Sequence, residues 1–157
     1  MAPVLAEDLD GGSLAIAVVV ARFNSLVTER LLNGALAGLG ECGVAVERTL
    51  VAWVPGAFEL AFAARQLAAG GRYDAVVCLG CVIKGETDHD RYISNEAARG
   101  IAQVSADTGV PAIFGVLTPN NLDQALARAG EGSTNKGHEA ALAAVVMANL
   151  RRSLREA

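Results

Sequence analysis

Residues 14–21 read Leu-Ala-Ile-Ala-Val-Val-Val-Ala, an almost unbroken run of small and β-branched apolar side chains. Such a run is typical of a strand that is buried on both faces of a parallel sheet. It ends in Arg22-Phe23-Asn24-Ser25, where Asn24 or Ser25 can cap a helix. The following helix is expected to stop at Gly40 to Gly43 and to bury one apolar face, formed by Leu32, Ala35, Leu36 and Leu39.

The same order of strand and helix occurs again along the chain. Apolar segments predict three more strands, at residues 44–53, 75–81 and 112–117. Helical patterns follow them, from Pro55 to Gly70, from about Arg91 to Asp107, over 122–129 and from about Gly137 onward. Strands that alternate with helices are joined by right-handed crossovers. The sequence therefore predicts one domain over residues 1–157, a three-layer α/β sandwich with a four-stranded parallel sheet.

Composition limits the functions that this chain can have. A chain of 157 residues holds one substantial core but is short for two domains. Hydrophobic residues make up 52% of the chain and charged residues only 19%. This composition gives more apolar surface than the core of one small domain can bury, so we expect subunit interfaces. A net charge of −4 without a basic run argues against nucleic-acid binding and against a polybasic membrane anchor.

The chain also lacks the pattern of a signal peptide and any apolar stretch of membrane-spanning length, so we expect a cytoplasmic protein. Its cysteines are odd in number, and a domain of this size does not need disulfides. Reduced thiols are therefore expected at Cys42, Cys78 and Cys81.

Ligands of parallel α/β sheets bind beyond the carboxyl ends of the strands. Phe23 follows the first predicted strand, Phe58 follows the second, and Phe114 lies within the fourth. In a chain with only 4% aromatic residues, this grouping favours a platform for a planar heterocycle over ordinary core packing. Glu59 stands in the first turns of a helix, where it can complement the helix dipole or accept hydrogen bonds from polyol hydroxyls.

The densest chemistry follows the third strand, where residues 81–90 read Cys-Val-Ile-Lys-Gly-Glu-Thr-Asp-His-Asp. Thr87 and Asp90 have the spacing of a helix capping box. A helix start with free backbone N–H groups can bind an anion, so a phosphate could lie on the amides around Glu86 and Thr87, although plain capping would need no ligand. His89, between two aspartates, is the candidate general acid and base, and the alternative is a surface histidine without a role.

Three other readings of this region are disfavoured. Cys78 and Cys81 have the spacing of a redox pair, but residues three apart in a strand point to opposite faces of the sheet. A zinc site would lack ligands, since only His89 is nearby. Covalent catalysis by Lys84, through an imine with a ketone, is the weaker alternative to acid and base catalysis.

Cationic side chains occur near the last two predicted helices. Arg128 closes a helix, where it can complement the helix dipole or bind a phosphate through its planar guanidinium. Lys136 and His138 flank the start of the last helix, and His138 is expected to face solvent.

From about Leu14 to the C-terminus, the chain resembles the lumazine synthase family. None of the matching segments is specific alone, but five or six in the same order and spacing are. They are Arg22-Phe23-Asn24, Val54-Pro55-Gly56-Ala57-Phe58-Glu59, residues 79–87 (Leu-Gly-Cys-Val-Ile-Lys-Gly-Glu-Thr) with His89, Phe114-Gly115-Val116-Leu117-Thr118, residues 124–130 (Gln-Ala-Leu-Ala-Arg-Ala-Gly) and Asn135-Lys136-Gly137.

The resemblance implies a flavodoxin-like fold and a transferase that needs no cofactor or metal. The implied reaction condenses 5-amino-6-(D-ribitylamino)uracil with 3,4-dihydroxy-2-butanone 4-phosphate to 6,7-dimethyl-8-ribityllumazine, phosphate and water. His89 would transfer protons, and Phe23 would stack on the pyrimidine. The other implied contacts are Ala57, Phe58 and Glu59 to the ribityl chain, the backbone of Cys81, Val82 and Ile83 to the uracil edge, Glu86, Thr87 and Arg128 to the phosphate, Phe114 as closure of the pocket, and Lys136 as a further candidate.

The resemblance also implies a homo-oligomer with active sites between subunits. Family members form pentamers, and some assemble them into a 60-subunit shell, with the equivalents of Phe114 and Arg128 coming from the neighbour. Riboflavin synthase is a candidate partner, and residues 1–12 are expected to form an extended arm that packs on a neighbouring subunit. Asp90 departs from the aromatic residue that many members have after the histidine, and the loop 131–134 departs from the usual glycine-rich sequence. The first departure leaves His89 in its place, and the second leaves pentamer and shell both open.

Two functions from other classes fit the sequence less well. A carrier of lumazine or flavin would keep the pocket without turnover, but it would not need His89 together with Arg128. A receiver-type signalling domain would need an acidic cluster after the first strand and a phosphoacceptor Asp after the third, where Arg22 and Ile83 stand instead.

Overall fold

Four short strands form the central sheet: β1 (Ile16–Ala21), β2 (Thr49–Val54), β3 (Ala75–Cys81) and β4 (Ala112–Leu117). The computed structural model describes residues 1–157, and in it all strand pairs are parallel with the order β2-β1-β3-β4. The central strands β1 and β3 are buried along their whole length, as expected for runs without polar side chains, whereas both edge strands are partly exposed. The predicted four-stranded parallel sheet is thus confirmed.

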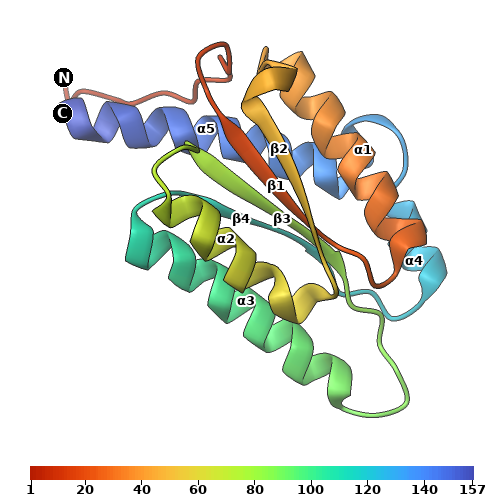
Figure 1. Cartoon of the computed structure of the whole chain (residues 1–157). Helices are drawn as coiled ribbons and strands as arrows, with labels where there is room; N and C mark the ends of the chain where they lie inside the picture. Colours follow the sequence, from red (N-terminus) through yellow and green to blue (C-terminus); the bar gives the residue numbers. More distant parts are fainter.

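Five α-helices cover the sheet: α1 (Ser25–Glu41), α2 (Leu60–Ala69), α3 (His89–Thr108), α4 (Leu122–Ala127) and α5 (Lys136–Glu156). Figure 1 shows α2 and α3 on one face of the sheet and α1 and α5 on the other. Alternate residues of β1 divide between the two layers, with Val18 and Val20 packed towards α1 and α5, and Ala17 and Val19 towards α2 and α3. The three-layer sandwich is therefore confirmed. None of the helices combines the length and apolar character that crossing a membrane requires.

Several boundaries differ from those that the sequence predicts. The strand expected over 44–53 shortens to β2, because Val46–Arg48 forms a 3-10 turn with exposed charged side chains. The helix expected from Pro55 begins with a second 3-10 turn, Ala57–Glu59, before α2. In α1, Leu36 is exposed, because the inward face is centred on residues 31, 35 and 39. The other boundaries lie close to the predicted ones, with β1 starting at Ile16, α3 at His89 and α5 at Lys136, and α4 ending at Ala127.

Helices α1 and α5 pack closely because glycines stand where their backbones approach each other. A Cβ atom at Gly137 would collide with the carbonyl of Leu31, and one at Gly34 would overlap the side chain of Asn135. Asn135 is buried and caps α5: its Oδ1 accepts two backbone N–H groups of the first turn, and its Nδ2 donates to two carbonyls of other segments. These contacts fix where residues 128–136 lie against α1.

His138 does not face solvent, so that expectation from the sequence is wrong. Its side chain is only 10% exposed, and its Nε2 lies 2.7 Å from Oε2 of Glu41 at the end of α1. The two residues are 97 positions apart and meet only because α1 packs on α5, which local sequence patterns do not reveal.

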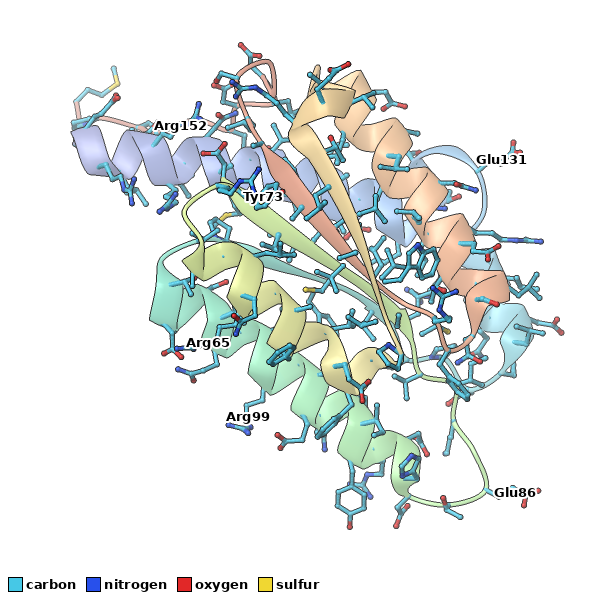
Figure 2. All side chains as sticks on the ribbon, in the orientation of Figure 1. Arg65, Tyr73, Glu86, Arg99, Glu131 and Arg152 are labelled. Atoms are coloured by element: carbon cyan, nitrogen blue, oxygen red, sulfur yellow. The ribbon has the colours of Figure 1, made fainter.

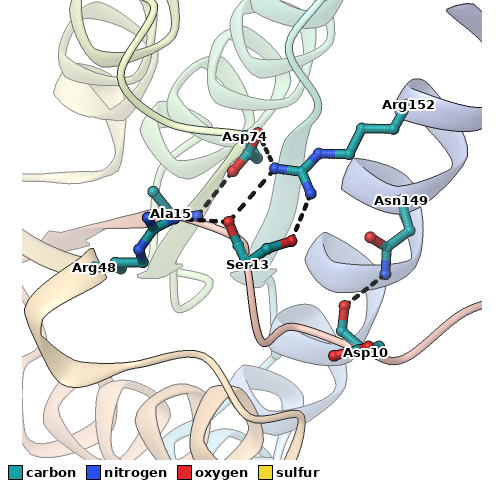
Figure 3. Close-up of polar contacts among 7 residues, drawn as sticks. All are labelled: Asp10, Ser13, Ala15, Arg48, Asp74, Asn149 and Arg152. Carbon is teal, nitrogen blue, oxygen red and sulfur yellow. Dashed lines mark hydrogen bonds and ion pairs between the residues drawn. The ribbon is translucent and has the colours of Figure 1, made fainter.

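The first ten residues form neither helix nor strand and run exposed along α5 (Figure 1). Asn149 of α5 donates to two carbonyls of this arm. Figure 3 shows how the chain then enters the sheet: Arg152 donates to Oγ of Ser13 and lies 3.2 Å from Oδ1 of Asp74, whose Oδ2 accepts the N–H of Ala15. These contacts fix the amino end of the sheet, while the expected packing of residues 1–12 on a neighbouring subunit stays a prediction.

Candidate active site

A pocket of about 280 Å³ lies at the carboxyl ends of β1, β2 and β3, where the sequence predicts a ligand. The three strand ends and the first turns of α3 contribute its walls. Seven of its twelve residues are hydrophobic, and the titratable side chains among them are Glu59, His89, Asp90 and Cys81. The lining consists of Phe23, Asn24, Gly56, Ala57, Phe58, Glu59, Cys81, Val82, Ile83, His89, Asp90 and Ile93.

Two aromatic rings of this pocket are largely exposed. Phe23 is 72% and Phe58 56% exposed, although both belong to backbone segments that are held in place. The N–H of Phe23 donates to the carbonyl of Pro55 at 3.0 Å, which extends the pairing of β1 with β2 beyond the strands. Ala57, which lines the same pocket, is buried, in contrast to the two rings. The rings therefore offer free faces on a fixed backbone, which suits stacking on a planar ligand.

Ile83, two residues after the end of β3, has free backbone hydrogen-bonding groups. The N–H groups of Val82 and Lys84 donate to the carbonyls of Leu117 and Pro119 on the β4 side, at 2.8 and 3.0 Å. Because successive residues of an extended strand direct their backbone groups to opposite sides, those of Ile83 point towards the β1 side. The N–H and C=O of Ile83 make no hydrogen bond within the chain.

The neighbouring carbonyl, that of Cys81, is already in use. It accepts a 2.7 Å hydrogen bond from Nδ2 of Asn24, the residue that follows Phe23. The sequence suggested Asn24 only as a helix cap, and its side chain makes no cap bond to α1. A polar residue three positions after a strand end was the signal that could have marked it as part of the site.

His89 is the first residue of α3 and is exposed at the rim of the pocket. Its N–H donates to Oγ1 of Thr87 at 3.3 Å. The predicted capping box of Thr87 with Asp90 is wrong, because the helix cap is Asp88 and no side chain closes a reciprocal bond there. Asp90, which the sequence did not select as a site residue, lines the pocket beside His89.

Glu86 and Thr87 lie outside this pocket. Figure 2 shows Glu86 at the tip of the loop between β3 and α3, with its carboxylate directed away from the sheet. Both residues are exposed and precede the first turn of α3 rather than forming it. Their amides are therefore not part of a helix start in this chain.

A second pocket, of about 500 Å³, lies beyond the carboxyl end of β4. Arg128 and Lys136 line it together with Thr118, Asn120 and Gln124, so its cationic groups face polar neighbours. It shares no lining residue with the first pocket. Phe114 lies in neither, since it stands in the middle of β4 opposite Cys78 and is 39% exposed.

The three cysteines are free thiols. Cys78 packs in the apolar cluster under α2 and α3, whereas Cys81 packs in the cluster under α1 and α5, which confirms that they point to opposite faces. Burial raises the pKa of the Cys78 thiol to about 12 and that of Cys81 to about 11. The redox reading fails because two thiols on opposite faces of the sheet cannot form a disulfide with each other. No group of three or more His, Cys, Asp or Glu side chains lies close enough together to hold a metal ion.

The structure thus brings together eight of the predicted site residues in one aromatic pocket and two more, Arg128 and Lys136, in a cationic one. Comparison with protein families gives a match between residues 13–152 and the 6,7-dimethyl-8-ribityllumazine synthase family. The match covers the whole sheet, both pockets and almost all of α5. The chain therefore belongs to the 6,7-dimethyl-8-ribityllumazine synthase family, the transferases of riboflavin biosynthesis.

Proposed function

We propose that this chain condenses 5-amino-6-(D-ribitylamino)uracil with 3,4-dihydroxy-2-butanone 4-phosphate and releases 6,7-dimethyl-8-ribityllumazine, phosphate and water. In this reaction the amine of the pyrimidine forms an imine with the ketone, phosphate leaves, and the second nitrogen closes the ring. Each step moves a proton to or from nitrogen or oxygen, which a positioned imidazole accelerates. His89, at the pocket rim, is the group to which we assign this role.

The observation that carries the proposal is the pairing of free aromatic faces with a free backbone amide. A uracil ring presents N–H and C=O groups along one edge and a planar face at right angles to it. The exposed ring of Phe23 supports stacking on that face. The unbonded N–H and C=O of Ile83 support hydrogen bonds to the edge, with Cys81 and Val82 forming the wall beside it. A buried site that hydrogen-bonds a polar edge discriminates strongly against analogues that lack it.

The ribityl chain is assigned to the side of the pocket formed by Ala57, Phe58 and Glu59. The carboxylate of Glu59 lines the pocket and can accept hydrogen bonds from several hydroxyl groups of a polyol. Ala57 and the ring of Phe58 add apolar surface beside this carboxylate.

The phosphate is assigned to Arg128, which lies in the separate cationic pocket of the same chain. We infer that a neighbouring copy supplies this pocket, with Lys136 and Phe114, so that one active site spans two subunits. Glu86 and Thr87, exposed on the loop before α3, would then meet the phosphate from the first subunit. The exposed apolar side chains at Phe62 and Tyr92, each 71% exposed, support an oligomer.

A pentamer, or a 60-subunit shell of pentamers, is the assembly that we propose, with residues 1–12 as an arm on the neighbour. Riboflavin synthase as a partner and a cytoplasmic location stay predictions.

The test mixes purified protein with both substrates and records the lumazine chromophore and released phosphate against the slow uncatalysed background. Accelerated chromophore formation with equal phosphate release is the expected result. Binding of the pyrimidine or of lumazine without acceleration would favour a carrier instead. Neither binding nor acceleration would contradict both assignments.

A further inference from the structure

Asn24 is the only residue other than glycine with a positive φ in this chain, at φ 62° and ψ 45°. This left-handed conformation costs most residues roughly 1 kcal/mol, and asparagine tolerates it better than others because its short amide can bond locally. Here the amide does not bond locally: it makes no cap bond to α1 and reaches the carbonyl of Cys81, 57 positions along the chain.

The bond from Asn24 to Cys81 continues the sheet where backbone pairing has ended. The register of β1 with β3 stops at Val20 and Leu79. Cys81 lies two residues further along β3, where β1 offers no backbone N–H to its carbonyl. Nδ2 of Asn24 donates to this carbonyl instead, at 2.7 Å and in a partly buried position. The side chain therefore does what a backbone N–H of β1 would have done.

This contact fixes two substrate-facing elements at once. Phe23 is tied on one side by its own N–H to the carbonyl of Pro55, and on the other by Asn24 to β3. Its ring is 72% exposed, so these backbone anchors, and not side-chain packing, decide where it stands. The carbonyl of Cys81 is already bonded to Asn24, whereas Ile83, which lines the same pocket as Phe23, keeps a backbone N–H and C=O without a partner in the chain.

We propose that Asn24 is a positioning residue that holds the Phe23 loop against the end of β3 and so sets the gap into which the pyrimidine fits. The inference rests on the proposed function, since it names the pyrimidine as the ligand of that gap. Its role is separate from catalysis: Asn24 acts through Phe23 and Cys81 and leaves proton transfer to His89.

Three substitutions separate the hydrogen bond from the backbone conformation. Asn24→Gly adopts a positive φ freely but has no amide, and Asn24→Asp tolerates the same conformation but turns a second acceptor towards the Cys81 carbonyl. Asn24→Ala loses both the amide and the conformational preference. The matched control is Ser105→Ala, which removes a partly buried bond of 2.8 Å between a side chain and the Ala112 N–H at the opposite end of the sheet.

The readouts are the KM of each substrate, kcat and equilibrium binding of the ribitylaminouracil. Binding can be followed by the fluorescence of Trp53, the only tryptophan, whose ring lies 5.1 Å from the guanidinium of Arg22 next to the loop. We expect the Gly and Asp variants to raise the pyrimidine KM and Kd about tenfold, because a loop no longer tied to β3 holds Phe23 in the binding position for only a fraction of the time. The KM of the sugar phosphate should change less than about twofold, and Ser105→Ala should alter neither.

Wild-type affinity and kinetics in Asn24→Gly would overturn the proposal, since only the backbone conformation would then matter. The proposal would also be overturned if the Asn24 variants raised the KM of both substrates equally and lost the same thermal stability as Ser105→Ala. That pattern would mean that the substitutions loosen the fold in general and do not act on the pyrimidine site. Failure of the wild-type protein to form lumazine would instead overturn the proposed function, and the binding measurement would still decide whether Asn24 positions the loop for the pyrimidine.

Discussion

The backbone N–H of Lys136 donates to the carbonyl of Arg128 at 2.8 Å, so two cationic residues from different elements meet at one pocket beyond β4. The ammonium of Lys136 already pairs with Glu139 at 2.8 Å. Arg128 makes no ion pair within the chain, so its guanidinium is the group in this pocket that an incoming anion can bind through two parallel hydrogen bonds.

Arg128→Ala is expected to weaken use of the sugar phosphate and to leave pyrimidine affinity close to that of the wild type. Loss of a charge-assisted pair of hydrogen bonds should raise the sugar-phosphate KM by about 30-fold, which corresponds to about 2 kcal/mol. Arg128→Lys keeps the charge but cannot form two parallel hydrogen bonds, so its sugar-phosphate KM should lie between those of the wild type and Arg128→Ala. Steady-state kinetics with each substrate varied in turn checks this, and a comparable rise in the pyrimidine KM would contradict the assignment.

His89→Ala is expected to lower kcat at least about tenfold, because proton transfers then depend on solvent. The pyrimidine Kd should stay near the wild-type value, since the stacking and edge contacts assigned to Phe23 and Ile83 do not involve the imidazole. Rapid-mixing kinetics and a direct binding titration give the two quantities. Unchanged kcat with weaker binding would assign His89 to substrate holding and not to proton transfer.

Glu41→Ala should destabilise the fold by about 1 kcal/mol, because it leaves a nearly buried imidazole nitrogen of His138 without its partner. Glu41→Gln retains a hydrogen-bonding side chain and should recover part of the loss. Urea unfolding at one protein concentration measures the effect, and Glu139→Ala, which removes an exposed pair, is the control that should shift the midpoint little. Equal midpoints for wild type and Glu41→Ala would show that the contact contributes nothing to stability.

Alkaline pH should destabilise the protein through its buried thiols. Burial raises the pKa of Cys78 to about 12 and that of Cys81 to about 11, from an ordinary value of 9.0. The unfolded chain therefore releases these protons at a pH where the folded chain retains them. Stability is intact below about pH 9 and falls above it, by up to about 1.4 kcal/mol per pH unit for each thiol.

Cys78→Ala should make the decline above pH 9 shallower, with a constant cost from the smaller side chain at all pH values. Unfolding curves at about pH 8 and about pH 10 distinguish the slope from that constant cost. The same slope in both proteins would mean that Cys78 does not contribute to the decline.

The fold could be predicted from the sequence because its strands carry local signals. The predicted runs over 75–81 and 112–117 contain no charged side chain, and they coincide with β3 and β4 at both ends. The strand predicted over 44–53 started too early because Val44, Ala45 and Val46 are apolar, but Val46–Arg48 forms a 3-10 turn and the pairing of β2 with β1 begins only at Thr49.

The site could be predicted only in part, because some of its contacts depend on tertiary packing. Phe23 and Phe58 follow strand ends, and the position of a parallel strand end is enough to select them as candidates, whereas Ile83 was expected only from the family resemblance. The contacts of Asn24 with Cys81 and of His138 with Glu41 span 57 and 97 positions and exist only once the sheet and helices have packed. No local pattern distinguishes such a residue from a helix cap or a surface histidine.

Mixed oligomers of His89→Ala and Arg128→Ala chains test the central claim most directly, namely that one active site takes His89 from one subunit and Arg128 from its neighbour. Each variant alone should be impaired, whereas co-refolded mixtures in equal amounts should recover activity at about a quarter of the interfaces, those where both intact residues meet by random pairing. Chromophore formation measured before and after co-refolding gives the answer. Activity that stays at the mean of the two separate variants would contradict the account, because a site contained within one chain cannot be restored by mixing.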